Sequence, residues 1–204
     1  GLASFNERLA REFQHRGWET KVITFSLQYP QFLFPGKTQL SSEPKPSDLN
    51  IEEKINSVNP FNWIIQGIKL KKWNADLVIT RFWIPFMGPC LGTLLYLIRQ
   101  NNHSRIVCIV DNLIPHERRF GDSWLTRYFV SKPHSFICMS ETVRAELQMM
   151  CPHAKTDLVN HPLFDNFGPP MNQQDARKLL GLPIHSKIAL FFGFIRKYKG
   201  LGIH

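Results

Sequence analysis

The sequence predicts an α/β protein in which a parallel β-sheet is covered by helices on both faces. Short runs of apolar and β-branched residues alternate along the chain with longer segments of helical periodicity, a pattern typical of βαβ units. The 204 residues are 43% hydrophobic and 20% charged, a composition that supports a packed core. Because connections between parallel strands are right-handed, these units are expected to build one Rossmann-like sheet.

A helix is predicted at the start of the chain. Four apolar residues between Leu2 and Phe13 recur at helical spacing, and Gly17 is a suitable stop. A strand is predicted at residues 21–25. Since the helix comes first, at least one strand of the sheet is expected to precede it.

Residues 27–58 look irregular, because they contain four prolines and the polar run SSEPKPSD. A loop of this length within a compact domain is typical of a lid, a binding loop or a disordered segment. The aromatic residues in 29–34 are expected to pack locally rather than to bind a ligand.

Regular alternation begins after Pro60, which suits the first turn of a helix. The predicted elements are a helix at 61–73, a strand at 76–80, a helix at 83–99, a strand at 105–110, a helix at 123–130, a strand at 135–139, a helix at 141–150 capped by Ser140, a strand at 156–159, a helix from Asn172 to Gly181 and a strand at 188–192. Residues 161–174 are rich in Pro and Gly. We therefore expect an N-terminal domain at 1–160, with the linker and the start of a second domain at 161–204.

The net charge of +9 favours an anionic partner such as nucleic acid, a phosphorylated small molecule or a membrane surface. A nucleic-acid-binding module would gather its basic residues on one face. Here they are spread through helices and loops and no reader motif is present, so nucleic acid is not expected as a partner. Residues 68–73 (IKLKKW) mix cations with apolar groups and suggest peripheral membrane contact, with a solvated helix face as the alternative.

The four cysteines have no CxxC spacing, which favours reduced thiols in a cytoplasmic protein over a disulfide framework. Neither HExxH nor DxD occurs, and no protein-bound metal is expected. The uncharged stretch 82–98 contains two prolines and two glycines and is shorter than the roughly 20 residues of a membrane span. A helix buried against the sheet is expected there.

The most apolar predicted strand, 105–110, leads into a polar loop that carries Asp111, His116 and Glu117. Open parallel sheets bind ligands at the carboxyl ends of their strands, so this loop is the first candidate site. His116 and Glu117 are adjacent and point in different directions, and either is suited to hold a sugar hydroxyl or to act as a general base. A solvated loop that caps the strand is the alternative.

Two further segments are candidates for binding phosphate. Residues 193–200 (GFIRKYKG) contain Arg196 and Lys199, which are suited to neutralise a diphosphate, although a basic surface turn is the alternative. Gly1 opens the first helix, whose N-terminal N–H groups would face phosphate or sugar.

In order along the chain, these segments resemble a bacterial branch of the family 4 glycosyltransferases, which have the GT-B fold. The resemblance covers nearly the whole chain, which corresponds to the N-terminal half of such an enzyme. It rests on the segments GLASFNERLAREFQHRGWETKVITF, YPQFLFPGK, VNPFNW, DNLIPHERR, FICMSETVRAEL and LFFGFIRKYKGL. It implies metal-independent transfer, with retention, of a sugar from a nucleotide-diphosphate sugar to a glycan or lipid-linked acceptor, as in polysaccharide biosynthesis. The expected location is the cytoplasm or the inner face of the cell membrane.

The resemblance also assigns roles to residues. Arg196 and Lys199 match positions that meet the departing diphosphate, and Gly1 matches the second glycine of the donor-facing turn. Family members often have His after the central strand, where this chain has Asp111; His116 and Glu117 either substitute for it or contact the acceptor.

The resemblance further places the first strand and the acidic donor-binding motif outside residues 1–204, so little or no transferase activity is expected from these residues alone. The alternatives to a transferase are a non-enzymatic Rossmann-like binding or sensor domain and a basic nucleic-acid-binding module.

Overall fold

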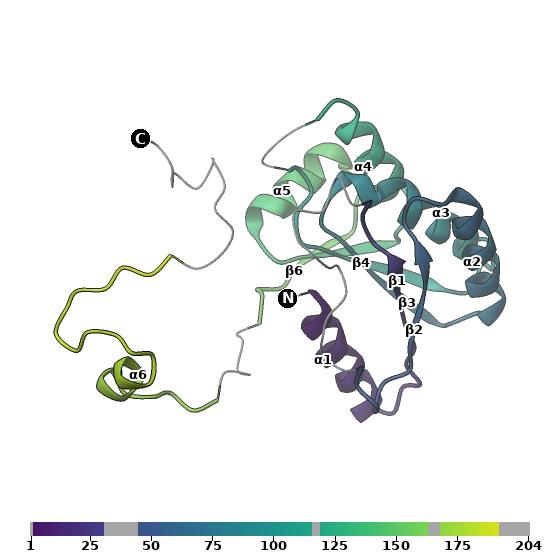
Figure 1. Cartoon of the computed structure of the whole chain (residues 1–204). Helices are drawn as coiled ribbons and strands as arrows, with labels where there is room; N and C mark the ends of the chain where they lie inside the picture. The colour runs from purple at the N-terminus through teal and green to yellow at the C-terminus, as the bar shows by residue number, and fades with distance from the viewer. Residues whose placement is uncertain (1, 31–44, 116–118, 163–167, 192–204) are drawn as a thin grey trace. The chain divides into compact units, whose positions relative to one another are not determined.

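The computed structural model describes residues 2–30, 45–115, 119–162 and 168–191 of the chain (Figure 1). The chain divides into two compact units, Gly1–Asn160 and His161–His204. In the described part of the second unit there is one short helix, α6 (Gln173–Leu179), whose N-cap is Asn172 as predicted.

The first unit is built on parallel strands, which confirms the predicted α/β class and its Rossmann-like character. The described strands form two sheets rather than one. In the smaller sheet, β1 (Val22–Leu27) pairs with β2 (Ile51–Asn56). The larger sheet has the order β3 (Leu77–Phe82), β4 (Arg105–Val110), β5 (Ser135–Cys138) and β6 (Thr156–Leu158). Every pairing is parallel, so the carboxyl ends of β3 to β6 meet at one edge of the larger sheet.

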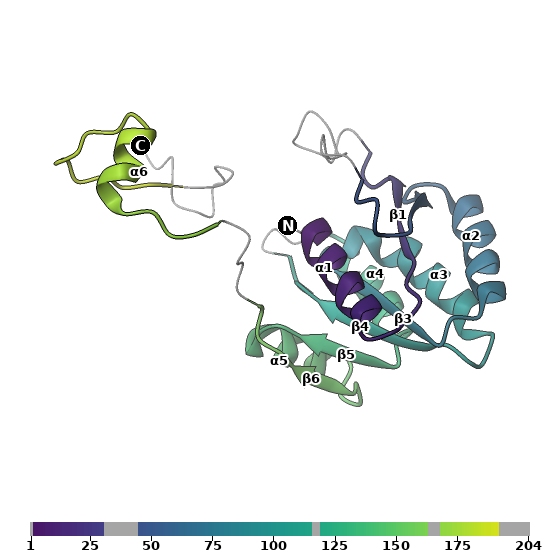
Figure 2. The ribbon, with the colours of Figure 1, turned by 90° about the horizontal axis from the view of Figure 1, so that it is seen from below.

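Helices lie on both sides of the larger sheet (Figures 1 and 2). On one side are α3 (Gly88–Arg99), α4 (Asp122–Val130) and α5 (Glu141–Met150), with α2 (Pro60–Trp73) packed against α3. On the other side is α1 (Leu2–His15). The helices that follow β2 therefore lie on the opposite face of the sheet from α1, as in a doubly wound fold.

The predicted helix boundaries have the expected physical causes. The Ser140 hydroxyl accepts a hydrogen bond from the Val143 N–H at 3.3 Å and caps α5. Pro60 is in the first turn of α2, and the Asn59 side chain accepts from the Asn62 N–H at 3.2 Å. Gly17 follows α1 with φ +85°, a conformation that glycine adopts without steric cost.

The core lies between the larger sheet and α3 and α4. At its centre Phe82, the last residue of β3, stacks on Phe129 of α4 with 4.3 Å between ring centroids. Both side chains are fully buried, which fixes the carboxyl end of β3. All four cysteines are free thiols, as expected, and burial raises the pKa of Cys90 to about 12.

The uncharged stretch 82–98 is buried in this core rather than forming a span. A 3₁₀ turn, η2 (Pro85–Met87), precedes α3, so the predicted helix 83–99 is shorter than expected. The side chains of Cys90, Leu94 and Ile98 are buried. Within the described residues, no helix combines the length and apolar character needed to cross a membrane.

Two secondary-structure predictions were wrong. Residues 27–58 do not remain irregular throughout, because β2 forms at Ile51–Asn56. Its sequence, IEEKIN, buries Ile55 and directs charged side chains outward, and Glu52 pairs with Lys21 at 2.8 Å. No strand forms at residues 188–191, where Leu190 is 83% exposed, since an apolar run becomes a strand only when another strand pairs with it. Phe192 is outside the described residues.

His134 ties β4 to the start of β5. The Ile106 backbone N–H donates to His134 Nδ1 at 2.9 Å, and the His134 N–H donates to the Ile106 carbonyl at 2.8 Å. Burial lowers the pKa of His134, and the nearby charges of Arg99 and Arg105 lower it further. The neutral ring is therefore the form that the fold requires, because a protonated Nδ1 cannot accept a hydrogen bond.

We predict that His134 makes stability fall as the solution is acidified. Well above pH 6.5 this ring is neutral in both the folded and the unfolded state, and its contribution to stability is fully present. As pH falls below 6.5 the unfolded chain takes up a proton before the folded protein does, so the contribution is lost. Urea unfolding should show that the free energy of unfolding falls more steeply between about pH 7.5 and about pH 5 in the wild type than in His134→Asn. The amide oxygen of Asn accepts the hydrogen bond without titrating. The exposed His153→Asn variant is the control, and a profile for His134→Asn parallel to the wild type would contradict the prediction.

Candidate functional site

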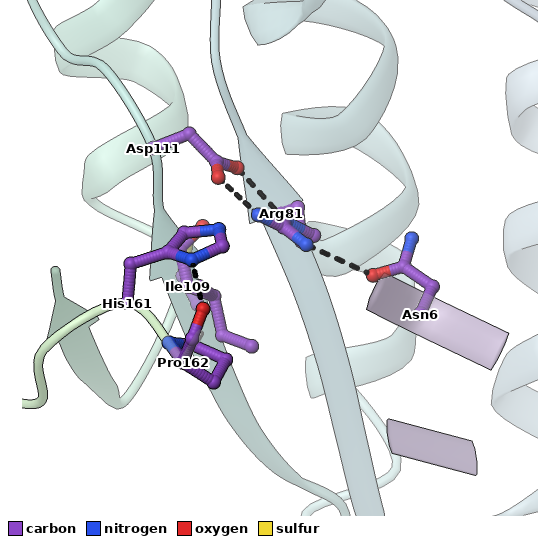
Figure 3. A network of polar contacts seen from close by, with 7 residues as sticks. Asn6, Arg81, Ile109, Asp111, His161 and Pro162 are labelled. Atoms are coloured by element: carbon purple, nitrogen blue, oxygen red, sulfur yellow. Dashed lines mark hydrogen bonds and ion pairs between the residues drawn. The ribbon is translucent and has the colours of Figure 1, made fainter. Parts of the chain in front are cut away.

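Two charged residues meet at the carboxyl edge of the larger sheet. Arg81 lies one residue before the end of β3, and Asp111 directly follows β4. The guanidinium engages both carboxylate oxygens: Nε donates to Oδ2 at 2.9 Å, and Nη2 donates to Oδ1 (Figure 3). The side chains are only 6% and 17% exposed, respectively. This is a largely buried, bidentate ion pair, the strongest geometry that Arg offers to a carboxylate.

The remaining faces of the Arg81 guanidinium are contacted by α1. Nη1 donates to the Asn6 side-chain oxygen at 3.4 Å (Figure 3). The guanidinium carbon lies 4.2 Å from the centroid of the Phe5 ring, within the range of a cation–π contact. Arg81 therefore joins the first turns of α1 to the ends of β3 and β4.

The position of the Asp111 carboxylate is fixed by these contacts. Its backbone N–H donates to the Phe82 carbonyl at 2.9 Å and continues the pairing of β4 with β3. Both carboxylate oxygens accept from Arg81, and this leaves their remaining lone pairs for a hydroxyl or water. Asp111 is thus the member of the predicted catalytic set that the structure describes, and it is at the predicted edge.

A cavity of about 420 Å³ lies at the loop that follows Asp111. The loop after β4 and the start of α5 line it with Asn112, Ile114, Pro115, Ser140, Thr142, Val143 and Glu146. The lining thus combines residues that carry amide, hydroxyl and carboxylate groups with the apolar residues Ile114, Pro115 and Val143. This mixture suits a small hydroxylated ligand that has both polar and apolar faces, such as a sugar ring.

Glu146, which lines this cavity, has a buried polar atom without a partner in the described part of the chain. Its Oε2 atom is buried and has no hydrogen-bond partner among the described residues. A buried carboxylate oxygen without a partner costs free energy, whereas a ligand hydroxyl that donates to it recovers that cost. Ser140 is less available, because its hydroxyl accepts from the Val143 N–H.

The other predicted site residues are outside the described part of the chain. These are the catalytic candidates His116 and Glu117 and the donor-binding candidates Gly1, Arg196 and Lys199. No group of three or more His, Cys, Asp or Glu side chains suited to a metal ion occurs in the described ranges.

Sequence reasoning missed Arg81, Asn6 and Glu146. A signal for Arg81 existed, since it is the one charged residue in the strand LVITRF and stands near the strand's end. Asn6 and Glu146 had no such signal, because polar residues on amphipathic helices usually face solvent. Their proximity to the edge depends on how α1 and α5 pack.

Comparison of the sequence with protein-family models and with curated proteins gave no match.

We predict that Asp111→Ala destabilises the first unit strongly. Removing one member of a buried pair leaves the Arg81 charge without its counterion, which costs about 3 kcal/mol in the free energy of unfolding. Replacing both residues, with Arg81→Met and Asp111→Ala, should recover most of that loss. Asp48→Ala, which breaks the surface pair with Arg11, is the matched control and should change stability much less. Equal losses in Asp111→Ala and Asp48→Ala, measured by urea unfolding, would contradict the assignment.

Proposed function

We propose that this chain is part of a glycosyltransferase that moves a sugar from a nucleotide-diphosphate sugar to a glycan or lipid-linked acceptor, with retention and without a protein-bound metal. On this proposal residues 1–160 are the acceptor-side domain of a GT-B fold, and residues 161–204 are the linker and the start of the donor-binding domain. The observation that supports the proposal is the cavity at the carboxyl edge, lined by the loop after Asp111 and by the start of α5, together with the buried Glu146 Oε2 atom that has no hydrogen-bond partner among the described residues.

On this proposal the acceptor sugar binds in this cavity. Glu146 accepts a hydrogen bond from an acceptor hydroxyl, while Asn112 and Thr142 donate to or accept from others. The apolar face of the ring packs on Ile114 and Pro115. The reactive hydroxyl then points toward Asp111 and the loop that carries His116 and Glu117, from which the general base is drawn.

The donor is held mainly by cations that meet its diphosphate. Negative charge builds up on the departing diphosphate while the sugar becomes oxocarbenium-like, so positive charge and N–H groups must face that group. Arg196, Lys199 and the helix start at Gly1 are assigned this role. Arg81 is not, because its charge is already matched by Asp111; its part is to position the carboxyl edge.

A non-enzymatic sensor for nucleotide sugars is the second candidate, since the same framework and cavity serve a binding protein equally well. The two candidates differ in turnover. A transferase releases nucleoside diphosphate when donor and acceptor are both present, whereas a sensor binds the nucleotide sugar and leaves it intact.

The test measures the binding of methyl hexosides, UDP-glucose and GDP-mannose to the whole chain by saturation-transfer NMR. We expect a hexoside signal in the wild type and a loss of affinity of roughly tenfold or more in Glu146→Gln, because a hydrogen bond to a charged group contributes about 1.5–3 kcal/mol. Glu141→Gln, on the same helix but paired with Arg144 at 2.7 Å, is the control and should bind like the wild type.

Three outcomes bear on the proposal. Absence of any hexoside or nucleotide-sugar binding would contradict it. Equal affinity of Glu146→Gln and the wild type for the hexoside would show that the acceptor does not bind in this cavity. Binding of a nucleotide sugar without release of nucleoside diphosphate, in a longer chain that includes the donor-binding domain, would favour the sensor.

A further inference from the structure

The outer face of α2 exposes a row of large apolar side chains. They stand at positions i, i+3, i+4 and i+7, so they lie on one side of the helix. Their exposed fractions run from 42% to 78%. We call this row the α2 stripe, and it consists of Phe61, Ile64, Ile65 and Ile68. Contiguous exposed apolar patches on soluble proteins mark interaction sites.

The opposite face of α2 makes the contacts that hold this helix in the fold. Gly67 approaches α3 so closely that a Cβ atom there would lie 2.5 Å from Leu97 Cδ1. Trp63 packs against the core, and its indole N–H donates to the Asn56 carbonyl at 2.8 Å. Both views show α2 at the rim of the first unit, with α3 on its inner side (Figures 1 and 2). The α2 stripe therefore points away from the packed face, and the fold does not depend on it.

Positive charge gathers at one end of the α2 stripe. The helix contains no acidic residue, and its cations all lie toward its C-terminal end, at Lys69, Lys71 and Lys72. With about 3.6 residues per turn, Lys72 continues the stripe, while Lys69 and Lys71 flank it on either side. None of these lysines forms an ion pair with a described carboxylate. Glu52 is within range of the Lys69 charge, but it is already paired with Lys21 at 2.8 Å.

This distribution of charge disfavours a second copy of the chain as the partner. If two copies packed with their α2 helices antiparallel, the lysines of each would face the N-terminal end of the other helix, where N–H groups carry partial positive charge. Parallel packing would set the lysines of both copies side by side. Because either arrangement brings like charges together, the α2 stripe is not complementary to itself.

The same distribution distinguishes α2 from a helix that lies in a lipid surface. Segments that bind anionic lipids carry about four to eight cations, and interfacial helices carry them along their polar face. The first half of α2, PFNWIIQ, contains none. An apolar half without cations, followed by a lysine-rich end, instead matches a partner whose own charge is confined to one end.

We infer that the α2 stripe docks an amphipathic helix of a partner protein, which lies antiparallel to α2 and carries carboxylates in its first turns. Antiparallel packing sets the N-terminal turns of the partner helix against the lysine-rich end of α2. Asp and Glu are favoured at that place by the helix dipole, and there they pair with the lysines. Apolar residues at i, i+3, i+4 and i+7 are the anchors by which such helices dock on apolar surfaces.

This inference does not rest on the proposed function. The residues that line the cavity at the carboxyl edge come from the loop after β4 and from the segment Ser140–Glu146, and none is in α2. Failure of hexoside binding would therefore leave the α2 stripe untouched, and the reverse also holds.

The test is fluorescence anisotropy of a labelled synthetic helix of about 18 residues, titrated with the 204-residue chain. The peptide has Leu at i, i+3, i+4 and i+7, Asp and Glu only in its first turns, and Gln and Ala elsewhere. A control peptide has the same composition with the acidic residues in its last turns. We expect saturable binding of the first peptide that weakens as salt is raised, and binding of the control that is about tenfold weaker or more.

Matched variants of the chain locate the contact. Phe61→Ser and Ile65→Ser should each weaken binding by about tenfold or more, because central anchors carry most of the energy of an interface. Trp124→Ser is the control, since Trp124 is 76% exposed on α4 against 78% for Phe61, and it should bind like the wild type. The double variant Lys69→Gln, Lys72→Gln should weaken binding and reduce its dependence on salt. All these residues are exposed, so the variants keep the fold, as urea unfolding checks.

Several results would overturn the inference. Absence of binding, equal affinity for the two peptides, or equal losses in Phe61→Ser and Trp124→Ser would show that the α2 stripe does not dock an acidic helix in this way. Flotation of the chain with phosphatidylglycerol vesicles that is lost in Phe61→Ser would assign the stripe to a membrane. A dimer that light scattering detects in the wild type but not in Ile65→Ser would assign it to a second copy.

Discussion

The buried ion pair between Arg81 and Asp111 is the contact on which the rest of the carboxyl edge depends. Two neighbouring strands end in opposite charges that engage through two parallel hydrogen bonds. Burial of either charge alone is costly, so each side chain holds the other in place. The contacts of Arg81 with Asn6 and Phe5 extend this constraint to α1. As a result, three elements far apart in the sequence have fixed positions around one polar point.

This arrangement separates positioning from binding. The Arg81 charge is neutralised inside the protein. On the proposed function, the ligand is therefore bound by the groups of the neighbouring cavity, above all Glu146. The cavity draws on the loop after β4 and the start of α5, as expected of a parallel sheet whose ligands bind beyond its strand ends.

The sequence predicted the parallel α/β class, most helices and strands, and the edge that carries Asp111, because apolar periodicity and capping residues are local signals. Prediction from the sequence failed where the structure of a segment depends on a contact with residues far away in the sequence. The charged strand IEEKIN pairs as β2 because β1 lies beside it, and the apolar run after Lys187 has no described strand to pair with. Arg81 could have been recognised as a charge within an apolar strand, but its partner follows 30 residues later and only the sheet register brings them together. Glu146 depends on the packing of α5 and had no local signal.

The most direct measurement on the central claim is the ¹⁵N NMR spectrum of the arginine side chains. A guanidinium held by two hydrogen bonds to a carboxylate, and shielded from water, exchanges its protons slowly and cannot rotate freely about its C–N bonds. We expect Arg81 to give a protected Nε–H signal and separate Nη signals at neutral pH, while exposed Arg16 gives averaged, rapidly exchanging ones. An Arg81 signal that behaves like that of Arg16 would show that the pair with Asp111 does not order this edge.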